Sequence, residues 1–200
     1  MSHHDPTTTP SVATPRMPLL DPGQMTPAQR AAADELIAGP RKGVKGPFIA
    51  LLRSPELMAR LGRVGEFLRF QSSLSPRASE FATLIVAREW SQQFEWFVHV
   101  PLALKAGTSQ GVIDALREGR QPNGMSDEEV LVHAFTTELL AHRGVCDATY
   151  RAAVERLGEA GVVELTSLVG YFAAVSMVLN VAHIPEEPNS QVVPLPPLSR

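Results

Sequence analysis

A carboxylate and an imidazole stand one helical turn apart near the middle of the chain. Glu95 and His99 are four residues apart, and Gln92, Trp96 and Ala103 repeat the same spacing on either side. Residues three, four and seven positions apart share one face of a helix, so the carboxylate can contact the imidazole. A carboxylate beside an imidazole fixes its tautomer, and such a pair is suited to general acid–base chemistry.

A second carboxylate precedes this pair. Glu80 lies in an apolar segment that reads as a helix, and the connection to the next helix, at about Ser91, is short. If the two helices pack antiparallel, Glu80 approaches the same pocket and competes for the same proton. We therefore predict a catalytic site of His99, Glu95 and Glu80, in which His99 is the acid–base group, Glu95 orients it, and Glu80 is a second acid or base.

The alternative is an ordinary ion pair on a helix surface. The neighbours Trp96 and Phe97 favour at least partial burial, and buried charged groups are costly unless they are paired. We expect Trp96 in the core or at an interface, where it can also wall a pocket. The predicted substrate-binding residues are Gln92, Trp96 and Arg88.

Cationic residues provide candidate anchors for a substrate carboxylate. Arg69, Arg77 and Arg88 are such candidates, and no spacing argument separates them. The loop 39–47, GPRKGVKGP, is basic but lacks the order G-x-x-x-x-G-K-S/T of a phosphate-binding loop. It reads either as a solvated loop or as a loop that lines a carboxylate pocket.

The elements that position these residues are predicted to be helices. Thr26, Ser54 and Ser75 each precede a proline, the usual pairing of an N-cap with the first helical residue. Ser126 and Glu129 form a capping-box pattern. The sequence therefore predicts an all-α fold, a compact bundle of six to eight helices.

The organisation beyond the bundle follows from composition. Residues 1–21 are rich in Pro, Thr and Ser and are predicted to be a flexible arm, and the Pro-rich residues 186–200 an extended tail. The helical domain is expected over 22–185. Near its end, Asp147 is expected to cap a helix, and Gly161 is expected to separate that helix from the last one.

Composition also narrows the classes of function and the location. A net charge of −3 argues against binding to nucleic acid or an anionic membrane. The apolar segment 162–181 contains several polar residues, so we read it as a buried helix and not as a membrane span. The single cysteine, Cys146, excludes an internal disulfide, and no signal peptide is evident, so we expect a cytoplasmic protein.

The two central helices resemble the carboxymuconolactone decarboxylase and alkylhydroperoxidase D superfamily. That family has a Glu on one helix, a C-x-x-C at the start of the next, and a His four residues after the second Cys. Counted back from His99, the cysteine positions hold Gln92 and Glu95, and Glu80 falls where the family has its glutamate. The resemblance covers roughly residues 44–185. Within the family, the sequence is similar to the decarboxylase-like branch.

The resemblance implies cofactor-free, metal-free proton transfer on a small carboxylated or lactone-like substrate. It also implies a homo-oligomer, a trimer or hexamer. One alternative is a hydroperoxide-reducing oxidoreductase, although the missing C-x-x-C argues against it because thiolates are the redox groups. The other alternative is a non-catalytic ligand-binding protein on the same fold, and turnover separates it from an enzyme.

Overall fold

The computed structural model describes residues 14–185 and 189–196, and every regular element within them is helical. A 3-10 turn, η1, comes first and eight α-helices follow, which confirms the predicted all-α bundle. The elements are η1 Pro22–Gln24, α1 Pro27–Ala38, α2 Pro47–Leu51, α3 Pro55–Phe70, α4 Pro76–Glu89, α5 Gln93–Ala106, α6 Gln110–Arg117, α7 Asp127–His142 and α8 Asp147–Ala182.

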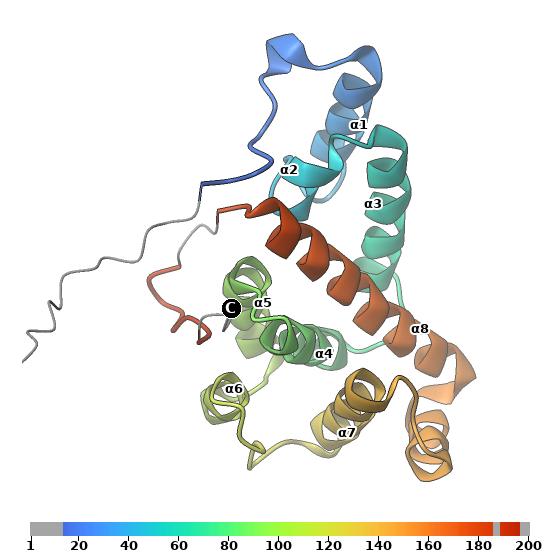
Figure 1. The fold of residues 1–200 in the computed structure, drawn as a ribbon. Helices are drawn as coiled ribbons and strands as arrows, with labels where there is room; N and C mark the ends of the chain where they lie inside the picture. Colours follow the sequence, from blue (N-terminus) through green and yellow to red (C-terminus); the bar gives the residue numbers. More distant parts are fainter. Residues whose placement is uncertain (1–13, 186–188, 197–200) are drawn as a thin grey trace, which may run out of the picture.

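The long helix α8 crosses the molecule, and α2, α3, α4 and α7 pack against it (Figure 1). Helices α1, α2 and α3 gather at its C-terminal end, and α6 and α7 lie at the opposite end of the molecule. The antiparallel pair α4–α5 lies between these groups, and α4 packs against α5, α7 and α8. The pair that carries the predicted catalytic residues is therefore at the centre of the fold.

Four helices, α1, α3, α4 and α7, begin at the positions that the local signals predict. The side chains of Thr26, Ser75 and Ser126 each accept a hydrogen bond from the backbone N–H three residues later, and Glu129 completes its capping box. Ser54 also precedes its helix, but its side chain makes no capping hydrogen bond. Proline at the first helical position is sufficient to mark that start.

A three-residue turn joins α4 to α5 and is tied to α8. Ser91 adopts a left-handed conformation with φ of 45°. The Gln92 side chain caps α5 by accepting from the Phe94 N–H and donates to Asn180 Oδ1 at 2.8 Å. Asn180 Nδ2 in turn donates to the carbonyl of Trp90 at 3.1 Å. These bonds hold the α4–α5 turn against α8 and so fix how the two helices sit relative to it.

Two hydrophobic cores fill the fold. The larger core lies among α4, α5, α7 and α8 and includes the fully buried side chains of Phe81 and Trp96. The smaller core lies among α1, α2 and α3 and is centred on Phe48, Leu52 and Met58. The two cores meet where α2 and α3 approach α5 and α8, and a cavity lies at this boundary.

Helix α8 is interrupted at a different residue from the one predicted. Gly158 has φ of 69° and ψ of 171°, so the helix is interrupted there and not at Gly161. Gly161 is instead helical and buried, and a Cβ added there would lie 2.7 Å from the Cβ of Leu157. By length and composition alone α8 is apolar enough to cross a membrane, and half of that apolar window is buried inside the bundle.

The two ends of the described chain pack on the bundle. Residues of the predicted N-terminal arm reach the end of α8, where the backbone N–H groups of Arg16 and Met17 donate to the carbonyl of Ala182. In the tail, Leu195 exchanges two hydrogen bonds with the side chain of Gln93 at the start of α5. Residues 1–13, 186–188 and 197–200 of the predicted arm and tail lie outside the described residues.

One glycine controls how the loop before α2 approaches α5. Gly46 has φ of 54° and ψ of −128°, a conformation that L side chains rarely adopt, and a Cβ there would lie 2.2 Å from the Phe94 ring. We expect Gly46→Ala to lower the free energy of unfolding by about 2–4 kcal/mol, from backbone strain and overpacking. Urea denaturation measures this change.

The control is a glycine without such constraints. Gly111 is helical in α6, and a Cβ there meets no atom within 4 Å. Gly111→Ala should raise the free energy of unfolding by about 0.5–1 kcal/mol, because alanine loses less conformational entropy on folding. If both substitutions have the same effect, Gly46 does not hold the loop against α5.

Candidate active site

His99 is held between two carboxylates from two helices. Its Nδ1 lies 2.6 Å from Oε2 of Glu80 on α4, and its Nε2 lies 3.3 Å from Oε2 of Glu95 on α5. The imidazole is 2% exposed, and its ring packs edge-on against Phe172 of α8 with centroids 5.0 Å apart. The expected approach of Glu80 to His99 is therefore confirmed, and the surface ion pair is excluded.

Both carboxylates contact the ring, and Glu80 makes the shorter contact. The predicted contact of Glu95 with His99 is present, and Glu80 fixes the ring through its other nitrogen. An ionised carboxylate only accepts hydrogen bonds, so the short contact places a proton on Nδ1. In the neutral imidazole Nε2 then carries only its lone pair, and in the imidazolium Nε2 carries the second proton and can donate it to Glu95. The nitrogen beside Glu95 is thus the one that can exchange a proton.

The surroundings of His99 favour its charged form. Burial on its own lowers the pKa of His99, but the hydrogen bonds with Glu80 and Glu95, together with the charge of Glu80, raise that pKa by more. The charge of Arg69 opposes them. The net result is a pKa above the ordinary value for histidine, so the ring carries a proton at a higher pH than an exposed one.

A cavity of about 290 Å³ opens beside His99 and Glu95. Its volume is close to the lower end of the range for small-ligand sites, roughly 300–1,000 Å³. The lining comes from the loop after α1 and from α2, α3, α5 and α8. The lining residues are Pro40, Arg41, Gly43, Lys45, Pro47, Phe48, Arg69, Phe70, Phe94, Glu95, Val98, His99, Tyr171, Phe172 and Val175.

Three cationic side chains, Arg41, Lys45 and Arg69, line this site cavity. None of them forms an ion pair with any residue in the described part of the chain. Among the described residues that line the wall, Glu95 is the one carboxylate. The basic loop 39–47 therefore lines the pocket, as one of the two interpretations of its sequence predicts. Its positive charge makes the cavity suitable for an anionic ligand.

The sequence does not predict that Tyr171 lines the site, because it is one tyrosine in an otherwise apolar helix. Its hydroxyl accepts a hydrogen bond from Arg41 at 3.5 Å, and burial raises the pKa of Tyr171 while the charge of Arg41 lowers it. The hydroxyl passes close to Gly65, where an added Cβ would lie 2.2 Å from it. Tyr171 therefore keeps its proton at neutral pH and lies fixed in the cavity wall.

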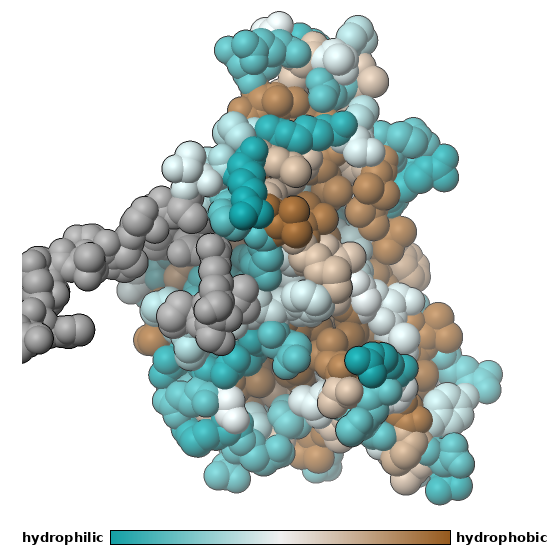
Figure 2. Space-filling model, viewed as in Figure 1, coloured by the Kyte–Doolittle hydropathy of each residue, from teal (hydrophilic) through white to brown (hydrophobic). Residues whose placement is uncertain are grey.

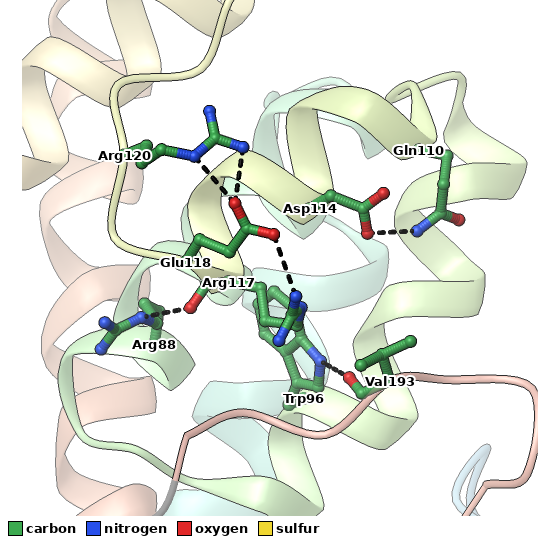
Figure 3. Close-up of polar contacts among 8 residues, drawn as sticks. All are labelled: Arg88, Trp96, Gln110, Asp114, Arg117, Glu118, Arg120 and Val193. Atoms are coloured by element: carbon green, nitrogen blue, oxygen red, sulfur yellow. Dashed lines mark hydrogen bonds and ion pairs between the residues drawn. The ribbon is translucent and has the colours of Figure 1, made fainter.

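The three predicted substrate-binding residues lie elsewhere. Trp96 is fully buried, and its Nε1 donates to the carbonyl of Val193 in the tail at 3.0 Å (Figure 3). Arg88 donates to the carbonyl of Arg117 at the end of α6, also shown in Figure 3. Gln92 is engaged in the α4–α5 turn. None of the three lines the site cavity, because tertiary neighbours occupy their polar groups.

A second, more open hollow lies on the other side of His99. It has a volume of about 530 Å³ and is lined by Glu80 and by residues of α4, α5 and α7, including Arg77 and Lys105. The Glu80 side chain is 16% exposed there. Glu80 therefore contacts His99 but does not line the site cavity, so the prediction that it approaches the same pocket as Glu95 is wrong. The two carboxylates face different spaces, and the buried imidazole lies between them.

The site cavity contains neither a thiol nor a cluster of metal-binding side chains from the described residues. Cys146 is exposed at the start of α8 and does not line the site cavity. Hydrogen bonds from Thr149 lower the pKa of the Cys146 thiol. Among the described residues, no group of three His, Cys, Asp or Glu side chains is arranged to hold a metal ion.

Comparison with protein-family models finds no match to this sequence, and comparison with curated proteins finds no similar one. The candidate site is therefore assigned from its own geometry and chemistry.

The raised pKa of His99 predicts how stability depends on pH. Because the folded pKa lies above the unfolded one, the stability contributed by His99 is fully present below about pH 6.5, the ordinary value. It is lost as the pH rises through the folded pKa. The difference in free energy of unfolding between wild type and His99→Gln should therefore be largest at low pH and shrink toward alkaline pH.

Urea denaturation over a pH series measures this difference. The packing lost in His99→Gln lowers the free energy of unfolding by the same amount at every pH. The part of the difference that changes with pH therefore reports the titration of His99. A difference that stays constant or grows as the pH rises would show that burial dominates over the two carboxylates.

Proposed function

We propose that the chain is a cofactor-free acid–base enzyme, similar to the carboxymuconolactone decarboxylase-like branch, that acts on a small carboxylated or lactone-like substrate. One observation supports the proposal most. A single cavity holds the His99–Glu95 pair together with three cationic side chains that have no ion-pair partner in the described residues. A proton donor and an attraction for anions are what such a reaction requires.

The chemistry can be written for a decarboxylation. The bond between the substrate carbon and its carboxylate breaks, carbon dioxide leaves, and the electron pair stays on carbon or moves onto a neighbouring carbonyl. Nε2 of the His99 imidazolium then gives its proton to that carbon. Glu80 stabilises the imidazolium through Nδ1, and a proton from solvent restores the charged ring. Glu95, 3.3 Å from Nε2, is placed to exchange that proton.

The two alternative functions remain distinguishable. The hypothesis of a hydroperoxide reductase has no support in the site, because the one thiol of the chain, Cys146, does not line the cavity. In addition, Gln92 and Glu95 occupy the positions at which the family has its redox cysteines. The ligand-binding reading uses the same cavity as the enzyme reading. Turnover alone separates these two, which is why the test of function is an activity screen.

The screen offers lactones and β-keto acids to the protein and measures release of carbon dioxide. For an active compound, we expect His99→Ala to lower kcat/KM by about 10²–10⁴-fold, the usual effect of removing a general acid–base group. Glu95→Gln should lose less, because the amide keeps part of the contact with His99.

The matched control is His142→Ala, which removes an exposed histidine at the end of α7. It should retain wild-type activity, and circular dichroism should show all three variants folded. Wild-type turnover in a folded His99→Ala variant would contradict the proposal.

We also propose that the chain assembles as a homo-oligomer, a trimer or hexamer. Helix α3 exposes Leu57, Val64 and Phe67, which are 47%, 47% and 44% exposed and lie on one face of the helix. Figure 2 shows apolar side chains reaching the surface over α3. Exposed apolar side chains that share one helix face can form a contact between proteins.

Light scattering after gel filtration tests this proposal. We expect a mass that is a multiple of 21.7 kDa at micromolar concentration, and a shift toward the monomer in Phe67→Glu, which puts a charge on the α3 face. Val130→Glu, on an exposed apolar residue of α7, is the control and should leave the assembly unchanged. A wild-type monomer would contradict the proposal.

A further inference from the structure

Of the two arginines that line the site cavity, Arg69 is the one whose guanidinium makes no hydrogen bond within the described residues, whereas Arg41 makes two. It lies in the last turn of α3, and its guanidinium sits 5.0 Å from the ring centroid of Phe70. Its Nε is buried and has no hydrogen-bond partner within the described residues. The buried Nε is itself out of reach of a ligand, but the Arg69 side chain lines the cavity and forms no ion pair among the described residues, so an anion in the cavity can bind the terminal nitrogens of its guanidinium.

The other two cations are engaged differently. Arg41 donates to the carbonyl of Gly62 and to the Tyr171 hydroxyl, and its guanidinium lies 4.8 Å from the Phe48 ring centroid. These contacts make Arg41 part of the wall. Lys45 is exposed, and its flexible ammonium suits the cavity entrance. Arg69 is therefore the cation with a free planar fork, the geometry that binds both oxygens of a carboxylate.

Arg69 is also placed close to the groups that would react. Its charge opposes protonation of His99 and lowers the pKa of Tyr171 against the raising effect of burial, so the guanidinium acts on both from the shared cavity. Five aromatic side chains, three of them from α2, α3 and α5 and two from α8, contribute to the same lining. Flat apolar walls of this kind favour a ring-shaped ligand.

We propose that Arg69 binds the carboxylate of a cyclic or aromatic carboxylate substrate and holds its ring against the aromatic wall beside Nε2 of His99. This inference rests on the proposed function, because it takes the cavity to be the substrate site. Binding can be measured without turnover, so the inference about Arg69 and the proposed function can fail separately.

The test uses benzoate as the probe and benzamide as its neutral counterpart. Isothermal titration calorimetry measures their binding to the full chain in wild type, Arg69→Gln, Arg69→Lys and Arg77→Gln. We expect benzoate to bind Arg69→Gln about 10- to 100-fold more weakly than wild type, the range for losing a hydrogen-bonded charge. Arg69→Lys should recover part of the affinity, because it keeps the charge but not the fork.

Arg77→Gln is the control, since Arg77 lines the hollow on the Glu80 side and not the site cavity. It should bind benzoate as wild type does, and benzamide should bind wild type much more weakly than benzoate. Thermal unfolding of each variant verifies that it is folded.

Four results would overturn the inference: equal benzoate affinity in wild type and Arg69→Gln, equal affinity of wild type for benzoate and benzamide, loss of binding in Arg77→Gln in place of Arg69→Gln, or no benzoate binding by wild type at millimolar concentration. If benzoate binds through Arg69 but turnover survives His99→Ala, the inference stands and the proposed function fails.

Discussion

The contact between His99 Nδ1 and Glu80 Oε2, 2.6 Å long and buried, is the interaction on which the candidate site depends. An imidazole that is 2% exposed loses most of its hydration, and burial on its own lowers its pKa. The Glu80 carboxylate compensates for that loss and fixes the ring through Nδ1. Only then is Nε2, beside Glu95, available in a charged, proton-donating form.

The fold supplies this contact by holding two helices in one register. The turn at Ser91 reverses the chain, and the hydrogen bonds of Gln92 and Asn180 hold that turn to α8. Phe172 of α8 then packs against the imidazole from the side. The same helix and the loop after α1 close the cavity, so the proton-exchanging nitrogen faces an anion-attracting space and not bulk water.

What the sequence predicted well depends on contacts that are local. Ser75 and Ser126 identify helix starts because their capping partners are three residues away, and Glu95 reaches His99 across one helical turn. The family resemblance and the short turn together pointed to Glu80. Trp96 shows where local reasoning ends: it lies at the expected spacing on the helix, but its polar partner comes from the tail, far away in the sequence.

The cavity wall shows the same limit. Tyr171 and Phe172 join Arg41 and Arg69 only through tertiary packing, and no spacing in the sequence relates them. Of the three arginines considered as anchors, spacing gave no reason to prefer Arg69. A buried Nε with no acceptor among the described residues distinguishes it, and that property exists only in the folded chain.

The most direct test is an NMR titration of the His99 imidazole in wild type and in Glu80→Gln. The amide keeps the shape of the carboxylate and removes its charge, so it isolates the contribution of the Glu80 contact. The pKa of His99 should lie above the ordinary histidine value in wild type and fall clearly in Glu80→Gln. A His99 pKa below the ordinary value in wild type, or one that Glu80→Gln leaves unchanged, would contradict the account.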